Sequence, residues 1–342
     1  MRRQRRRRRH RGLAAGIRYF IRKKYRAGLR VFQKKKRKGW LYIPLLVGIF
    51  LLGAGLRSCM EGENQLPLLA EKEMITLYHS GDRTTETLDF EEYILGVVAA
   101  EMPAAFELEA LKAQAVCART YAYQRILSGY AYPGGANVSD DPGTCQAYRS
   151  YEEFAKANPQ DTEMYYERLR QAVQETRGEI LVCGGAPLEA LYHSTCGGKT
   201  EDAASAWGEE LAGLESVDCA WCTASPCYRK EKTVPLSVIA RVMGVKSGEG
   251  LQITEWTASG RARKISAGGK TVSAEEFRRW LDLPSTWITL QRSGDNWIIS
   301  TRGYGHGIGL CQYGAGGMAK EGFSYQEILS HYYSGAALCC IE

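Results

Sequence analysis

The sequence predicts an α+β domain preceded by one transmembrane helix, with helices in the first half of the domain and antiparallel strands and glycine-rich loops after. Three observations predict this order. A charge-free run at residues 40–56 follows a strongly basic start. Apolar residues recur at a helical period between residues 89 and 127, whereas short alternating segments separated by glycine turns begin near Gly178.

The first part of the chain predicts a membrane anchor. Residues 1–38 hold 19 of the 45 Lys and Arg and no acid, so the remaining 304 residues carry 26 basic and 38 acidic side chains. The 17 uncharged residues 40–56 are at the short end for a membrane span, which needs roughly 17–25 residues. The basic flank is expected to stay in the cytoplasm. We therefore expect a cytoplasmic tail at 1–38, a single-pass span at 39–57, a stalk at 58–82 and a folded domain at 83–342 outside the cell membrane.

Other interpretations of this region remain open. A buried core helix, a cleaved signal peptide and a lipoprotein site at 56–59 are the alternatives, although the basic region is longer than that of a signal peptide. The tail could bind nucleic acid or anionic lipid head groups. Beside a membrane span we expect lipid, and the balance of −12 in the rest of the chain opposes nucleic acid as a partner.

Two helices are predicted in the first half. Asp89 can cap a helix with Glu92 three residues on, and Pro103 ends its apolar stripe. A second helix is expected from Glu107 to Leu127, closed by Gly129. A last helix is expected at 325–332 after Ser324. Strands are expected at 179–183 and 188–192 around a Gly-Gly turn, at 253–258 and 262–265, and at 297–300.

Glu101 is the first candidate for catalysis. It ends an apolar helix, and such surroundings raise the pKa of a carboxyl group, as a general acid requires. An exposed glutamate at a helix C-terminus is the ordinary alternative. Gln114 and Arg119 on the following helix can aim a hydrogen-bond donor and a cation at the same cleft, or can be solvated.

Two glycine-containing segments supply further candidates. At 192–201 an expected strand runs into a Gly-Gly pair, and at 303–309 glycine occupies every second position. Because glycine sacrifices side-chain packing and chain entropy, this pattern indicates a tight backbone path from which His306, Gln312 and Tyr313 project. No Gly-Lys-Ser/Thr follows, so the segment is not a phosphate loop.

Taken together, four segments resemble the stage II sporulation protein D family. They are residues 91–103, residues 110–122, His-Ser-Thr-x-Gly-Gly at 193–198, and Gly-x-Gly-His-Gly-x-Gly-x-x-Gln-Tyr-Gly-Ala at 303–315. The resemblance runs from about Arg83 to the C-terminus in the family's order, and the basic tail and single span also fit.

The resemblance implies a peptidoglycan lytic transglycosylase, which breaks the MurNAc–GlcNAc bond through the sugar's own 6-hydroxyl. Such chemistry needs one carboxyl group that acts as acid and then base, here Glu101, rather than a glycosidase pair. It further implies action on peptide-stripped glycan during engulfment, on the mother-cell side of the septum, with a cell-wall amidase and engulfment membrane proteins as partners. The implied substrate-positioning residues are Gln114, Arg119, His193, His306, Gln312 and Tyr313. A non-catalytic amidase enhancer is the alternative function.

Cysteine is abundant, with eleven residues. The zinc site of some family members is not expected here, since only Cys145 of its ligands is retained. A different set, Cys196, Cys219, Cys222 and Cys227, could hold a structural zinc ion, form two disulfides or remain as thiols. Cys117 and Cys311 are expected to be packing residues, and no cofactor is expected to be required for catalysis.

Overall fold

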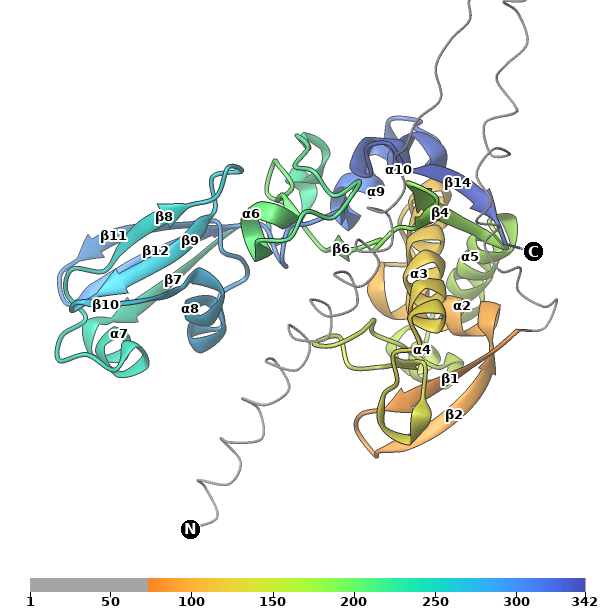
Figure 1. Ribbon diagram of the computed structural model, residues 1–342, viewed down its shortest axis with the longest axis horizontal. Helices are drawn as coiled ribbons and strands as arrows, with labels where there is room; N and C mark the ends of the chain where they lie inside the picture. Colours follow the sequence, from red (N-terminus) through yellow and green to blue (C-terminus); the bar gives the residue numbers. More distant parts are fainter. Residues whose placement is uncertain (1–72, 342) are drawn as a thin grey trace, which may run out of the picture. The chain divides into compact units, whose positions relative to one another are not determined.

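The computed structural model describes residues 73–341 (Figure 1). The predicted tail, the predicted span and most of the predicted stalk therefore lie outside the described residues. Within residues 73–341, no helix is long and apolar enough to cross a membrane.

The folded domain begins earlier than the sequence predicted. Strand β1 (Met74–His79), which had been assigned to the stalk, pairs antiparallel with β2 (Thr84–Asp89) and parallel with β3 (Val138–Ser139). Ile75 and Leu77 alternate along β1 and are fully buried in the larger core. This burial makes β1 part of the domain, so the stalk boundary at residue 82 was wrong.

Helices form most of the larger core. Helix α2 (Phe90–Glu101) is capped by Asp89, whose side chain accepts from the amides of Glu91 and Glu92. Helix α3 (Leu108–Ser128) ends at Gly129 in the left-handed conformation. Figure 1 shows α3 as the long central helix, with α2 and α5 (Thr162–Glu175) against it. Both predicted helices are confirmed, as is α10 (Tyr325–Tyr332) after its Ser324 cap.

Short strands complete this core. Strand β4 (Glu179–Cys183) lies between β14 (Ala337–Cys340) and β5 (Ala186–Pro187), all antiparallel. The Gly-Gly turn is confirmed, but the strand predicted at 188–192 was wrong: the returning strand β5 ends at Pro187, and of the predicted range only Tyr192 lies in a strand. The chain then forms β6 (Tyr192–His193), which pairs in parallel with β13 (Leu310–Cys311). This pairing brings the two glycine-containing segments side by side.

A second core lies within residues 229–302. One antiparallel sheet has the order β11 (Ile288–Ser293), β12 (Asn296–Arg302), β7 (Arg229–Pro235), and another the order β10 (Lys270–Ser273), β9 (Ala262–Ala267), β8 (Gln252–Trp256). Helices α7 (Leu236–Met243) and α8 (Ala274–Leu281) bury Ile239 and Phe277 between them and the strands. The predicted strands at 253–258, 262–265 and 297–300 correspond to β8, β9 and β12.

The structure confirms a mixed α+β fold with mainly antiparallel sheets, but helices are not confined to the first half. Helix α9 (Gln312–Lys320) was not expected, because three of its nine residues are glycine. Helices α7, α8 and α10 also lie in the second half. The remaining short elements are α4 (Tyr151–Ala157), α6 (Ala203–Trp207), and the 3-10 turns η1 (Pro133–Gly135) and η2 (Trp221–Ala224).

Candidate active site

Glu101 is the last residue of α2 and is partly buried. Its Oε1 accepts a hydrogen bond of 2.7 Å from the backbone amide of Ala147. Burial raises the pKa of Glu101 above its usual value, while the Ala147 amide and the side chains of Gln312 and Tyr192 act in the opposite direction. The C-terminal end of a helix is also unfavourable for a negative charge. Glu101 is thus a carboxyl group that holds its proton more tightly than an exposed glutamate does.

Gln312, whose side chain acts on Glu101, also contacts Gln114. Gln312 is the first residue of α9, and its Nε2 donates to Oε1 of Gln114 on α3 at 3.2 Å. Both side chains are buried. Nε2 of Gln114 is also buried and has no partner among residues 73–341, so this hydrogen-bond donor is unsatisfied.

Tyr192 belongs to this group although it was not predicted. Its hydroxyl donates to Oε1 of Gln146 at 2.8 Å, and Nε2 of Gln146 donates in turn to the Tyr93 hydroxyl at 3.3 Å. This chain holds the Tyr192 ring next to Glu101. Gln146 and Ala147 lie in an irregular loop with no periodic pattern, so nothing in the sequence distinguished them. Tyr192 directly precedes His193, which was predicted as a site residue, and only this neighbouring position in the sequence could have indicated Tyr192 as part of the site.

His193 and His306 have rings 5.5 Å apart. The Ile308 amide donates to Nδ1 of His306 at 3.1 Å, so Nε2 carries the proton that it donates to the Tyr192 carbonyl at 2.9 Å. Burial lowers the pKa of His306 to about 4. His306 is therefore neutral, with both nitrogens engaged in holding the backbone.

His193 has a different arrangement. Its Nδ1 lies 3.0 Å from the Ile308 carbonyl and must donate to it, which leaves Nε2 unprotonated. Burial lowers the pKa of His193 well below its usual value, with the nearby His306 and Arg261 acting in the same direction. Nε2 is buried without a partner among the described residues. His193 therefore offers an acceptor that a hydroxyl group can fill.

Two aromatic side chains, Tyr313 and Trp207, come from segments that contact those of the histidines. Tyr313 packs edge-to-face on Phe106 with ring centroids 5.2 Å apart, and its backbone amide donates to the Ser194 carbonyl at 3.0 Å. Trp207 is half exposed at the end of α6, with its ring 6.0 Å from that of His306. An exposed aromatic face of this kind can pack against a sugar ring.

The glycines at 303–309 are required by close backbone approach, as the sequence indicated. All four alternating glycines have positive φ. At Gly305, with φ of 108°, a Cβ atom would lie 2.9 Å from Cβ of His193, and at Gly309 it would meet the Leu191 carbonyl oxygen. The absence of side chains lets the loop carrying His306 lie directly against the segment carrying His193.

Arg119 lies elsewhere, contrary to the expectation that it shares a cleft with Glu101. Its guanidinium is fully buried and forms two hydrogen bonds of 2.7 Å to the Glu91 carboxylate, and others to the carbonyls of Val173 and Glu179. Glu91 precedes Glu101 by ten residues on α2, or about 15 Å along a helix. Arg119 therefore joins α2, α3 and α5 inside the larger core.

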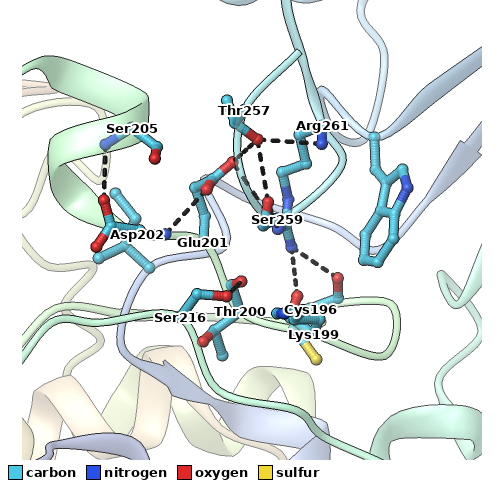
Figure 2. Close-up of polar contacts among 12 residues, drawn as sticks. Cys196, Lys199, Thr200, Glu201, Asp202, Ser205, Ser216, Thr257, Ser259 and Arg261 are labelled. Carbon is cyan, nitrogen blue, oxygen red and sulfur yellow. Dashed lines mark hydrogen bonds and ion pairs between the residues drawn. The ribbon is translucent and has the colours of Figure 1, made fainter.

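A polar network around Arg261 supports the loop after His193 (Figure 2). Nη2 of Arg261 donates to the carbonyls of Cys196 at 2.9 Å and Lys199 at 2.7 Å, and Nη1 donates to Ser259 at 2.8 Å. Thr257 donates to Glu201 at 2.7 Å in the same network. The two bonds from Nη2 satisfy the backbone carbonyls of Cys196 and Lys199 in the turn at 196–199.

Three of the four cysteines predicted as metal ligands come together, and one does not. Cys196, Cys219 and Cys222 form a buried cluster with Cys311. Cys227 instead lines a surface hollow of about 400 Å³ with Lys230 and Tyr304. Cys227 thus lies outside this cluster, whereas Cys311, which was expected to be a packing residue, belongs to it.

Comparison with known proteins identifies the family of this chain. The family model of the stage II sporulation protein matches residues 78–183. Stage II sporulation protein D of Bacillus subtilis (strain 168) is 37% identical over 276 residues, which cover 79% of this chain and 80% of the relative. The chain belongs to the stage II sporulation protein D family.

Other relatives are similar to this family member. Stage II sporulation protein D of Bacillus amyloliquefaciens is 34% identical over 274 residues, covering 79% of this chain and 80% of the relative. A protein named amidase enhancer from Bacillus subtilis (strain 168) is 29% identical over 300 residues, covering 71% of this chain but only 40% of that protein. The similarity to sporulation proteins therefore extends over most of both chains.

Proposed function

We propose that this sporulation-family protein is a lytic transglycosylase that cleaves the MurNAc–GlcNAc bonds of peptide-stripped peptidoglycan, with Glu101 as its acid and base. One observation carries the proposal. Glu101 is a partly buried carboxyl group of raised pKa, and the groups that act on this pKa are the Ala147 backbone amide and the side chains of Gln312 and Tyr192, with no second acid among them. A single protonated carboxyl group is what this reaction needs, whereas a hydrolase uses two.

The proposed reaction leaves Glu101 unchanged. The carboxylic acid protonates the glycosidic oxygen as the bond from that oxygen to C1 of MurNAc breaks. The resulting carboxylate then takes the proton of the C6 hydroxyl while O6 bonds to C1, which closes the anhydro ring and restores the acid. Water takes no part. Burial favours the protonated state that the first step consumes, and the Ala147 amide stabilises the carboxylate between the two steps.

Other residues are proposed to position the sugar. Nε2 of His193 is an acceptor and Nε2 of Gln114 is a donor, and both are buried without partners within residues 73–341. A sugar with vicinal hydroxyl groups can satisfy both, because each hydroxyl donates and accepts. Gln312 is proposed to hold the Glu101 carboxylate. Tyr313 and Trp207 are proposed to supply apolar surface for a pyranose ring, and His306 holds the backbone at Tyr192 and Ile308.

The setting of this reaction is proposed from the sequence. The basic tail and the uncharged run at 40–56 support a single membrane span that places residues 73–341 outside the cytoplasmic membrane. During engulfment this would be the mother-cell side of the septum. A cell-wall amidase that removes stem peptides and other engulfment membrane proteins are the proposed partners.

The test is digestion of peptide-free glycan strands by the purified full-length chain. Glu101→Gln should lower the rate by about 10²–10⁴-fold, the usual contribution of a general acid and base. Glu92→Gln is the matched control, since it makes the same change on the exposed first turn of the same helix. Equal rates for the Glu101→Gln variant and the wild type would refute this role.

Amidase enhancement is the second candidate, favoured by the relative that bears that name. Under this alternative the chain binds glycan and stimulates an amidase without cutting. The Glu101→Gln variant separates the two functions, because an enhancer would stimulate the amidase equally well without the carboxyl group.

A further inference from the structure

Four cysteine sulphurs form one compact group in the described part of the chain. The Sγ atoms of Cys196, Cys219, Cys222 and Cys311 all lie within 4.8 Å of one another, and all four residues are buried. They come from three separate segments: the turn after β6, the loop around η2, and β13. We propose that these four cysteines hold one structural Zn²⁺ ion.

The spacing of the sulphurs fits one tetrahedral ion. Zinc–sulphur bonds of about 2.3 Å place the sulphurs of a tetrahedron about 3.8 Å apart. The Sγ atoms of Cys196 and Cys222 are 3.4 Å apart, and the others are bounded by 4.8 Å. A cluster of several irons with bridging sulphides needs its ligands further apart than this. Cys219 and Cys222 also have the two-residue separation common in zinc sites.

Backbone amides point at the sulphurs as they do around metal thiolates. The Cys196 amide donates to Sγ of Cys311 at 3.2 Å, and the Gly314 amide donates to the same sulphur at 3.3 Å. The Gly198 amide donates to Sγ of Cys196 at 3.4 Å. Such bonds lower the charge on thiolate sulphur and orient it toward the ion.

Space for the group depends on a glycine. A Cβ atom at Gly314 would lie 2.7 Å from Sγ of Cys219 and would also meet the Tyr332 hydroxyl, which itself contacts that sulphur at 3.2 Å. Any side chain at position 314 would therefore displace a ligand. This requirement explains a glycine in the first turn of α9, where helix propensity opposes it.

The ion would join the two segments that line the candidate active site. Cys196 follows His193 by three residues, and Cys311 immediately precedes Gln312. The η2 turn that supplies Cys222 packs against α9. The Zn²⁺ ion would thus fix His193 relative to Gln312. This last consequence rests on the proposed function, whereas the metal site itself does not.

Metal content of the purified full-length chain tests the site without reference to activity. We expect about one zinc per chain by inductively coupled plasma mass spectrometry, a stoichiometry that follows from one four-sulphur site. Cys227→Ser is the matched control and should retain zinc, whereas Cys311→Ser should lose it. Replacement with Co²⁺ should give the intense visible absorption of a tetrahedral tetrathiolate, which reports on the wild-type chain even if Cys311→Ser fails to fold.

Three results would overturn the proposal. Wild-type chain that contains no zinc and takes up no Co²⁺ would exclude the site. Peptide mapping without reduction that finds Cys196 or Cys311 in a disulfide would assign the cluster to oxidised pairs. Loss of zinc from Cys227→Ser with retention in Cys311→Ser would restore the set of ligands predicted from sequence.

Discussion

Nε2 of Gln312 donates to Oε1 of Gln114 across 3.2 Å, and this bond joins two helices whose residues are 198 positions apart. An amide nitrogen carries two hydrogens, so the second N–H of Gln312 remains for the Glu101 carboxylate. The effect of Gln312 on Glu101 is to lower its pKa, against the larger effect of burial.

The pH dependence of cleavage should therefore respond to Gln312. In the proposed reaction Glu101 begins as an acid, so kcat/KM should fall as pH rises through the pKa of Glu101. In Gln312→Leu the carboxylate loses a donor, so the pKa rises and the alkaline limb moves to higher pH. The measurement is the pH profile of kcat/KM on peptide-free strands. An alkaline limb at the same pH in Gln312→Leu and in the wild type would show that Gln312 does not affect the pKa of Glu101.

Arg119 should affect stability and not catalysis. Arg119→Lys keeps a cation but loses the paired donors to Glu91, and we expect unfolding to become easier by about 1–3 kcal/mol, the cost of an unsatisfied buried group. Arg170→Lys is the control, because its contact with Glu92 is exposed and should contribute less than about 1 kcal/mol. Denaturant unfolding measures both. A variant of unchanged stability that has lost glycan cleavage would place Arg119 in the active site after all.

Gly305 should affect catalysis by letting the backbone approach His193 closely. Gly305→Ala combines the strain of a positive φ, about 1–3 kcal/mol, with a clash against Cβ of His193. Gly322→Ala has a similar φ of 91° but nothing within 4 Å, so it isolates the strain. Both variants should lose stability, and only Gly305→Ala should also lose kcat/KM at a temperature where both are folded. Equal activities would show that the close approach does not position His193.

The sequence predicted those elements whose signals are local. The Asp89 and Ser324 caps and the Gly129 terminus are each set by neighbouring residues, and the structure has all three. Helix α9 could not be predicted, because its glycines follow from distant packing: Cβ atoms at Gly316 and Gly317 would meet Phe106 and the Trp221 backbone.

The side chains of the site show the same difference between local signals, which the sequence reveals, and long-range contacts, which it does not. The glycine pattern at 303–309 predicted a tight backbone path, which the structure has. By contrast, the partner of Arg119 is 28 residues away, and Cys311 is 89 residues from the nearest other member of its cluster, Cys222. Spacing along the chain favoured Cys227 as the fourth member of the cluster. Only the folded structure shows that Cys311 occupies that position instead.

The most direct test of the central claim is mass spectrometry of the ends that the full-length chain leaves on peptide-free glycan strands. A transglycosylase that uses Glu101 as its only acid and base predicts 1,6-anhydro-MurNAc ends from the wild type and none from Glu101→Gln. Reducing MurNAc ends would contradict this account, since they require water as the nucleophile and a second carboxylate to activate it.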